Sequence, residues 1–145
     1  MTPIEVHPIP LAETRALRRE VLRPHLTLEE LASHEPAGSV GFGAYDGAEL
    51  VAVGLVGHEG EEPGDWRVRG MATKPHARRR GAGTRILQAL VQHAVAGGAT
   101  RVWANARTPA LTLYQRAGFV VTSDEFNPPD IGPHYRVELS IAAHH

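Results

Sequence analysis

The sequence predicts an α/β fold in which helices flank a mixed, mostly antiparallel sheet of about six to seven strands. Apolar runs of strand length recur along the chain, and two of them flank a hairpin-type turn in its first half. A strand–helix–strand order follows in the second half. The chain has 145 residues, of which 42% are hydrophobic and 21% charged. Because these values are ordinary for one globular domain, we assign residues 1–145 to a single domain.

The first half of the chain is predicted to contain four strands and two short helices. Asp46-Gly47 separates two apolar runs, and this pair favours the positive φ angles of a tight hairpin turn. Pro24 closes a helix predicted at 11–22. Thr27 is a suitable N-cap for a second helix at 28–33. Strands are predicted at 2–7, 40–45, 50–56 and 66–72, and an acidic loop at 59–64 precedes the last of them.

The second half is dominated by one amphipathic helix. Apolar residues at helical spacing predict it over residues 83–95, and Gly97-Gly98 ends it. Pro109 fits the first turn of a shorter helix at 109–117. Strands are predicted at 101–106, 119–122 and 135–141, with a proline-rich loop at 124–133.

Composition excludes several classes of function. The 15 Lys and Arg residues balance 16 Asp and Glu residues, so no bulk charge attracts nucleic acid or an anionic membrane. The chain has no cysteine, which excludes disulfides, zinc–thiolate sites and a thiol nucleophile. The nine histidines show no metal-ligand spacing, so we predict no metal. No signal peptide or membrane-length apolar stretch is recognisable, so we expect a cytoplasmic protein.

The stretch 68–84 carries the strongest chemical signal. It runs from a strand through a basic turn into the long helix. Gly81 and Gly83 lack a Cβ, so main-chain N–H groups can approach an anion closely, and the start of the helix adds unpaired donors. The arginines at 78–80 add charges that can pair bidentately with phosphate. These features predict a pyrophosphate site, although an arginine triplet alone would also fit a solvated basic turn.

Two other phosphate-binding loops do not fit this stretch. A Walker A loop needs a lysine that is missing here. A dinucleotide fingerprint needs a third glycine at the position that Ile86 occupies. The pattern Arg-x-x-Gly-x-Gly is therefore a different kind of loop.

Two blocks resemble the GNAT superfamily of N-acetyltransferases. Residues 78–83, Arg-Arg-Arg-Gly-Ala-Gly, match the Gln/Arg-x-x-Gly-x-Gly/Ala pattern of that family, and 71–75 look like its preceding strand. Residues 105–119 are similar to its Asn…Ala…Tyr-x-x-x-Gly-Phe segment. The blocks cover roughly residues 66–121, and the order of elements extends the similarity over most of the chain.

The resemblance implies a GNAT fold with a splayed sheet and acetyl-CoA as cofactor, lodged between parallel strands at 66–73 and 101–106. Main-chain groups near Met71 would bind the pantetheine arm and polarise the thioester carbonyl, and Asn105 would also bind the arm. Arg78 and the amides of 79–84 would bind the pyrophosphate. In full, the implied cofactor-binding residues are Met71, Ala72, Thr73, Arg78, Arg79, Arg80, Gly81, Ala82, Gly83, Thr84 and Asn105.

Tyr114 and His134 are the candidate catalytic residues. The resemblance implies that Tyr114 protonates the departing thiolate, and a tyrosine with a pKa near ~10 is protonated at neutral pH. The alternative for Tyr114 is a ring packed in the core. Family members often place a glutamate near the strand before the loop as the base, but this strand carries Arg67 and Arg69. His134 is our hypothesis for the proton acceptor, against the alternative of a structural histidine.

Three residues are candidates for binding the acceptor. Arg67 and Arg69 alternate along one strand and share a face, so they could hold a substrate carboxylate. Pairing with acidic residues of the 59–64 loop is the alternative for both. Glu125, in the proline-rich loop, is the third candidate.

These interpretations predict an acyltransferase that moves acetyl from acetyl-CoA to a primary amine by direct attack in a ternary complex. The acceptor is expected to be a small, amino-acid-like molecule rather than nucleic acid or membrane. A protein N-terminal or lysine amine is one alternative, and a CoA-binding regulatory module without turnover is another. A homodimer is left open.

Overall fold

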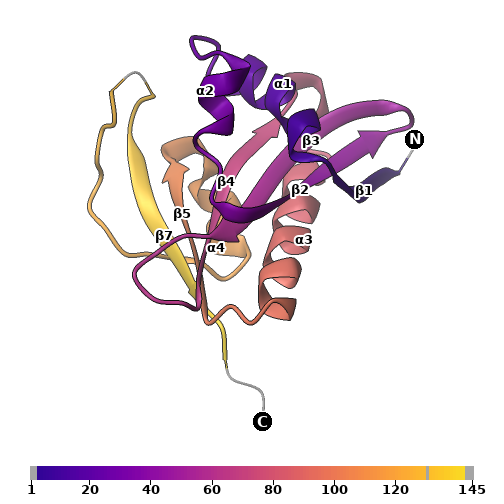
Figure 1. Ribbon diagram of the computed structural model, residues 1–145. Coiled ribbons are helices and arrows are strands. Elements are labelled where there is room, and N and C mark those ends of the chain that lie inside the picture. The colour runs from indigo at the N-terminus through magenta and orange to yellow at the C-terminus, as the bar shows by residue number, and fades with distance from the viewer. Residues whose placement is uncertain (1–2, 130, 143–145) are drawn as a thin grey trace.

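The computed structural model describes residues 3–129 and 131–142, and Figure 1 shows its elements. One sheet with the strand order β1-β2-β3-β4-β5-β7-β6 organises the fold. Its strands are β1 (Ile4–Ile9), β2 (Ala37–Asp46), β3 (Glu49–His58), β4 (Asp65–Thr73), β5 (Arg101–Arg107), β6 (Val120–Val121) and β7 (His134–Ser140). The helices are α1 (Leu11–Val21), α2 (Leu28–Ala32), α3 (Ala82–Ala96) and α4 (Leu111–Arg116), with single 3₁₀ turns η1 (Pro75–Ala77) and η2 (Thr108–Ala110).

Helices α1 and α3 cover opposite faces of the sheet. A Cβ built on Gly54 of β3 would lie within 3 Å of Ile86 and Leu90 of α3. The next residue back along the strand, Val53, packs with Leu17 of α1 instead. Successive strand residues point to opposite faces, so the sheet is buried on both sides at its centre.

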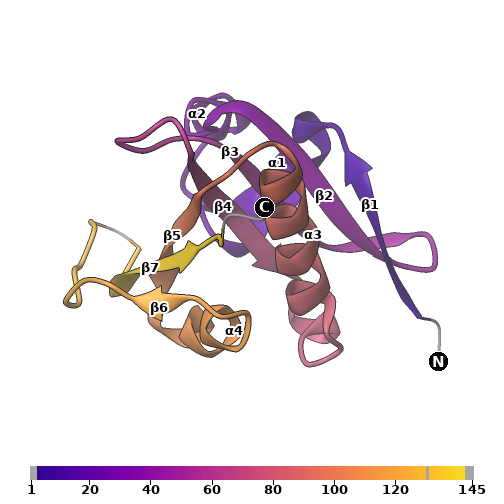
Figure 2. The same ribbon diagram turned by 90° about the horizontal axis from the view of Figure 1, so that it is seen from below.

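The parallel strands β4 and β5 pair only at one end. Asp65, Trp66 and Arg67 align with Arg101, Val102 and Trp103, and no further β4–β5 pairs follow among the described residues. From there β5 continues alongside β7 up to the pairing of Arg107 with His134. Figure 2 shows the result, with β5, β7, β6 and α4 turned away from β1–β4 and α3. This splay opens the space in which both cavities described below lie.

The paired end of the splay is closed by a buried ion pair. Two nitrogens of Arg101 bond the two carboxylate oxygens of Asp65 at 2.8 and 2.7 Å. The Asp65 side chain is 2% exposed. Hydrogen bonding from Arg101 holds the pKa of Asp65 below its ordinary value. The pair therefore locks the first residues of β4 and β5 together.

The predicted elements are all present, with their ends moved by a few residues. The first strand, predicted at 2–7, runs over Ile4–Ile9, and Thr2 lies outside the described residues. The strand predicted at 119–122 forms only Val120–Val121, because it pairs with β7 alone at the edge of the sheet. The predicted 66–72 strand contains an irregularity that the sequence did not reveal. At Gly70 the backbone has φ +63°, and the β3–β4 register shifts there.

No helix in the described residues is long and apolar enough to cross a membrane.

Candidate active site

The turn between β4 and α3 has the backbone conformation of an anion-binding loop. Gly81, the N-cap of α3, has φ +79°, and Arg79 has φ +68°. Positive φ at two nearby residues reverses the chain sharply, and it places the first turn of α3 with its unpaired N–H groups beside the loop. The positive end of the helix dipole also lies here, so the local field favours a negative ligand.

A cavity of about 830 Å³ lies along this turn; we call it the loop groove. The loop and the start of α3 form one wall, and η2 with α4 forms the other. Four guanidinium groups border it and, among the described residues, no carboxylate does. The residues of the groove that the argument uses are Met71, Thr73, Arg78, Arg79, Gly81, Gly83, Thr84, Arg107 and Arg116.

The space around Gly83 indicates whether the groove can accommodate the diphosphate of coenzyme A. A Cβ at this position would meet only Leu113 and Thr73, both at 3.7 Å, which is ordinary van der Waals contact. The protein itself would therefore tolerate alanine there. The missing Cβ leaves room on the groove side, where a ligand would approach the helix N-terminus. The glycine positions, the cationic lining and the absence of a carboxylate among the described lining residues all fit a diphosphate.

The three predicted loop arginines do not all face the groove. Arg78 borders it, and its Nε donates to the Thr73 carbonyl at 3.3 Å. Arg79 borders it as well. Arg80 lies outside the lining and pairs with Asp46 at 2.5 Å, across the β2–β3 turn. We therefore correct the expectation for the Arg80 side chain, because its charge is directed to Asp46 rather than to the groove.

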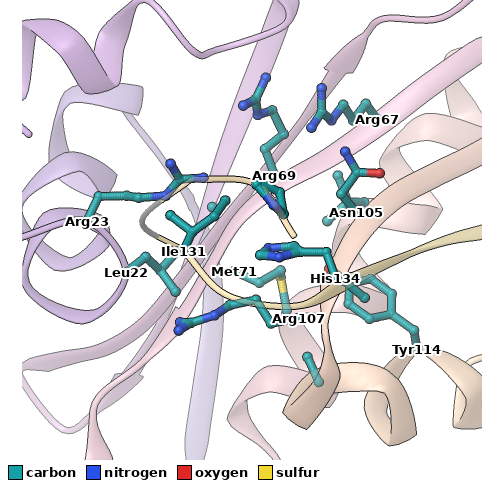
Figure 3. Close-up of a pocket in the computed structure, with 15 residues that line it drawn as sticks. Leu22, Arg23, Arg67, Arg69, Met71, Asn105, Arg107, Tyr114, Ile131 and His134 are labelled. Atoms are coloured by element: carbon teal, nitrogen blue, oxygen red, sulfur yellow. The ribbon is translucent and has the colours of Figure 1, made fainter. Parts of the chain in front are cut away.

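A smaller cavity of about 300 Å³ continues from the loop groove; we call it the arginine cavity. The two share Leu22, Met71, Arg107 and Ala110, so they adjoin at the open end of the splay. Residues from the end of α1, from β4, β5 and α4, and from the loop before β7 border it (Figure 3). The lining includes Arg23, Arg67, Arg69, Asn105, Arg107, Tyr114, Ile131 and His134.

Tyr114 lies in α4 with its ring buried against Phe119, at 5.3 Å between ring centroids. Its side chain also borders the arginine cavity, as Figure 3 shows. Within the described part of the chain its hydroxyl has no hydrogen-bond partner. Burial raises the pKa of Tyr114 above its ordinary value of 10, so the hydroxyl keeps its proton. The predicted alternative of a ring packed in the core is thus confirmed, and the residue also borders the cavity, while its role as a proton donor stays a prediction.

His134 opens β7 and is 5% exposed. Its Nδ1 lies 2.8 Å from the Gly132 carbonyl oxygen. A carbonyl can only accept, so Nδ1 carries the ring proton and Nε2 of the neutral ring keeps a lone pair. Burial lowers the pKa of His134 below 6.5, so the neutral form prevails at neutral pH. The residue therefore lines the cavity in a state that can accept a proton.

Arg67 and Arg69 combine the two roles that the sequence left open. Both border the arginine cavity. Arg67 also bonds Glu59 at 2.5 Å, and Arg69 lies 3.7 Å from the same carboxylate. The predicted pairing with the acidic loop is thus confirmed for Glu59. Arg67 is further held over the Trp103 ring, at 4.5 Å from its centroid, and its buried Nε has no partner in the described structure.

The irregularity in β4 is supported from beneath by Arg18. A Cβ on Gly70 would lie 2.7 Å from Arg18 Nε, so only glycine allows the guanidinium to pack under the strand. Arg18 is 3% exposed and is held by Glu35 at 2.7 Å and by the Leu31 carbonyl at 3.2 Å. This arrangement fixes the backbone that leads to Met71, next to both cavities.

Besides Arg80, two predicted site residues lie outside the lining of both cavities. Glu125 is exposed, accepts a hydrogen bond from the Tyr135 hydroxyl at 3.1 Å, and borders neither cavity. The structure therefore does not support its predicted part in acceptor binding. The Ala72 side chain packs with Leu17 and Val53 in the core, which leaves only its main chain for a cofactor contact.

Two of the arginines that line the cavity are not among the predicted site residues. The arginines of residues 17–24, Arg23 among them, fit either selection of an anionic acceptor or a solvated helix face, and the sequence predicts no role for Arg107. Arg23 belongs to no motif and reaches the site through the packing of α1. Arg107 lies inside the 105–119 block but is not one of its pattern residues, and the splay of β5 brings it to the cavity.

The fold and the site define a class of protein. A groove lined by cationic side chains and a helix N-terminus adjoins a small cavity that is bordered by a protonated tyrosine and a neutral histidine. This is the arrangement of a cofactor-dependent group-transfer enzyme, with one compartment for the donor and one for the acceptor.

Comparison with known proteins gives the family. The model of the Acetyltransferase (GNAT) family matches residues 7–119. The chain belongs to this family and is an acyltransferase. A curated relative, the Bacillus subtilis protein described as "Uncharacterized N-acetyltransferase YitI", is 28% identical over 137 residues, which cover 90% of this chain and 92% of the relative.

Solved structures show the same fold. The ribosomal-protein-S18-alanine N-acetyltransferase from Escherichia coli matches with a TM-score of 0.78 at 15% identity, covering 98% of this chain and 96% of that one. A Bacillus subtilis acetyltransferase solved in complex with CoA matches with a TM-score of 0.72 at 17% identity, covering 98% and 100%. The predicted GNAT fold, a mixed sheet of seven strands flanked by helices, is confirmed.

Proposed function

We propose that this acyltransferase transfers an acetyl group from acetyl-CoA to the primary amine of a small, amino-acid-like molecule, by direct attack within a ternary complex. One observation carries the proposal. Tyr114 and His134, a proton donor and a proton acceptor, border the same small cavity, and that cavity adjoins the loop groove at Met71.

The donor would occupy the loop groove. Thr84 and the main chain over 79–83 would receive the diphosphate, with Arg78 beside it. The open edge of β4 near Met71 and Thr73 would bind the pantetheine arm, and Asn105 on the facing strand would complete this contact. Two solved structures share this fold and support the assignment. One is the Bacillus subtilis acetyltransferase in complex with CoA, and the other is an Elizabethkingia anophelis acetyltransferase with acetyl-CoA bound.

Acetyl-CoA would supply an activated thioester. This chain would orient the two substrates and provide one group that accepts a proton and one that donates a proton. The acceptor nitrogen forms a bond to the acetyl carbon while the carbon–sulfur bond breaks. The nitrogen would lose its proton to Nε2 of His134, and the sulfur would receive one from the Tyr114 hydroxyl. Proton exchange with solvent would then return His134 to its neutral form and Tyr114 to its protonated form. Main-chain N–H groups near Met71 stabilise the negative charge that develops on the carbonyl oxygen.

The size of the arginine cavity supports a small acceptor. A volume of 300 Å³ corresponds to about ten water molecules at liquid density. A single amino acid or a similar amine fills such a space. The four arginines around it make it unfavourable for a lysine-rich protein tail.

Acetyl transfer to a panel of small primary amines tests this function. The release of free CoA thiol and the mass of the acetylated product are measured together, because hydrolysis of acetyl-CoA also yields thiol. We expect amine-dependent thiol release with a matching product. CoA binding without any acetylated product from amines or peptides would contradict catalysis and favour a regulatory module.

A further inference from the structure

The charges around the arginine cavity are unbalanced. Its described lining contains four arginines and neither an aspartate nor a glutamate. Glu59 is the one carboxylate that contacts any of these arginines in the described structure, and it is shared by Arg67 and Arg69. Among the described residues, one negative charge therefore accompanies four positive charges.

Arg23 and Arg107 are the uncompensated pair. No ion pair or hydrogen bond from either side chain to another described residue is present. Their charges also act on each other. The pKa of Arg23 is lowered first by burial and then by Arg107, and the pKa of His134 is lowered by burial and in part by both arginines. Burial and the neighbouring Arg67 lower the pKa of Arg69 to about 10.

Holding like charges together without a counter-charge destabilises the folded protein, so such a cluster is typical of an anion-binding site. Guanidinium groups are well suited to this task, because their fixed planar donors match carboxylate and phosphate oxygens.

We propose that Arg23 and Arg107 form an anion subsite and that the acceptor amine therefore carries a carboxylate or phosphate group. This inference rests on the proposed function, since it names the substrate class of the same site. The subsite lies on the side of the cavity formed by the end of α1 and the end of β5. Figure 3 shows Arg23 and Arg107 near Leu22 and Ile131, across the view from Tyr114.

Of the two arginines, Arg23 is the one whose substitution tests the anion subsite without changing the cofactor site. Arg107 borders both cavities, so a variant at this position could affect either substrate. Arg23 borders only the arginine cavity. Arg78, Arg79 and Arg116 remain for the phosphates of the cofactor.

Matched acceptor pairs provide the first test. Each α-amino acid is compared with its carboxamide, and phosphoethanolamine with ethanolamine, at constant ionic strength. The carboxamide has the more easily deprotonated amine, so intrinsic reactivity works against the expected result. We expect kcat/KM for the anionic member to be at least about tenfold higher, as for one charged hydrogen-bonding partner. The two pairs distinguish a carboxylate from a phosphate.

Two variants provide the second test. Arg23→Gln should raise the KM for the anionic acceptor about 10- to 100-fold and leave the KM for acetyl-CoA unchanged. Arg19→Gln is the matched control, because it removes the same charge from an exposed position on α1 that borders neither cavity. The selectivity for the anionic member should disappear in Arg23→Gln and persist in Arg19→Gln.

Thermal unfolding with CoA present gives a readout that needs no turnover. The same anionic compounds should raise the Tm of the wild-type protein and of Arg19→Gln, but not that of Arg23→Gln. Acetylation of amines with equal preference for carboxamides, and equal Tm shifts in both variants, would overturn the anion subsite and leave the proposed function intact. Absence of any acetylated amine would instead overturn the function.

Asp130 needs its own control, because it lies outside the described residues and adjoins Ile131 in the sequence. If Asp130 balanced the arginines, Asp130→Asn would by itself increase the affinity for anionic compounds, measured by the same Tm shift. An unchanged shift in Asp130→Asn is the result expected from the proposal.

Discussion

The two cavities of this enzyme are cationic and adjoin each other, yet they are built in different ways. The loop groove has its key residues in one continuous stretch, in which Gly81 and Gly83 define the start of α3. The arginine cavity is assembled from the ends of α1, β4 and β5, from α4, and from the loop before β7. The difference teaches that a site formed by the backbone of one continuous segment can be recognised as a sequence motif. A site formed by side chains from distant segments has no such motif.

The largest expected effect concerns Tyr114, which borders the arginine cavity. Tyr114→Phe should lower kcat about 100- to 1,000-fold, because the departing sulfur loses its proton donor. The KM for acetyl-CoA and the Tm should change little, since the hydroxyl has no partner among the described residues. Single-turnover measurements check this without interference from product release.

Tyr135→Phe is the matched control for this prediction. The Tyr135 hydroxyl bonds Glu125 and borders neither cavity, so its removal should leave kcat unchanged. Equal rates for wild type and Tyr114→Phe in single turnover would remove Tyr114 from the chemistry.

The second prediction concerns the ion pair that closes the splay beneath both cavities. Asp65→Asn should lower the free energy of unfolding by about 1–3 kcal/mol, because the buried Asp65 side chain loses two charged hydrogen bonds from Arg101, which keeps only Glu138 as an ion-pair partner in the described structure. The more exposed pair of Asp46 and Arg80 provides the control, and Asp46→Asn should cost less than about 1 kcal/mol. Urea unfolding at neutral pH measures both variants.

The same ion pair gives stability a defined pH dependence. The pKa of Asp65 is lowered in the folded state, so its contribution is complete above 3.8 and is lost as the pH falls through the lowered value. Asp65→Asn should reduce this acid sensitivity. A variant with an unchanged acid limb would show that Asp65 is not the group responsible.

The third prediction concerns the pH dependence of catalysis, which we expect to arise from His134 in the arginine cavity and not from the loop groove. If the neutral form of His134 accepts the proton, as proposed, kcat/KM for the amine should fall as the pH drops through a pKa below 6.5. His134→Gln should lower kcat about 10- to 100-fold and remove this limb of the profile. His76→Gln, at an exposed position that contacts Glu49, is the control and should keep the wild-type profile.

The smallest expected effect tests the loop groove. Gly83→Ala should raise the KM for acetyl-CoA about tenfold, because its methyl group occupies space on the ligand side. The protein accommodates a Cβ at 3.7 Å, and alanine is the better helix former, so the free energy of unfolding should rise by up to roughly 1 kcal/mol. Gln92→Ala, exposed on the same helix, should leave the KM unchanged. A lower Tm for Gly83→Ala would show that the glycine serves the fold instead.

Particular residues show how far the sequence could predict the site. The pattern around Gly81 predicted a basic turn that opens the long helix, and the structure has Gly81 as the N-cap of that helix. Tyr114 and His134 were named from a motif and from chemistry, and the structure brings both to one cavity. Glu125 failed because its loop turns it toward Tyr135, and the Arg80 side chain failed because Asp46 competes for its charge.

The sequence by itself determined the order of elements, the hairpin at Asp46-Gly47, the amphipathic α3 and the loop that precedes it, since each depends on interactions between residues close in the chain. Only the tertiary structure decided that β4 and β5 separate after three pairs, that Arg18 packs beneath Gly70, and that Arg23 and Arg107 face the same space. The physical reason is that packing and electrostatic contacts across the splay join residues far apart in sequence, and no local pattern encodes those contacts.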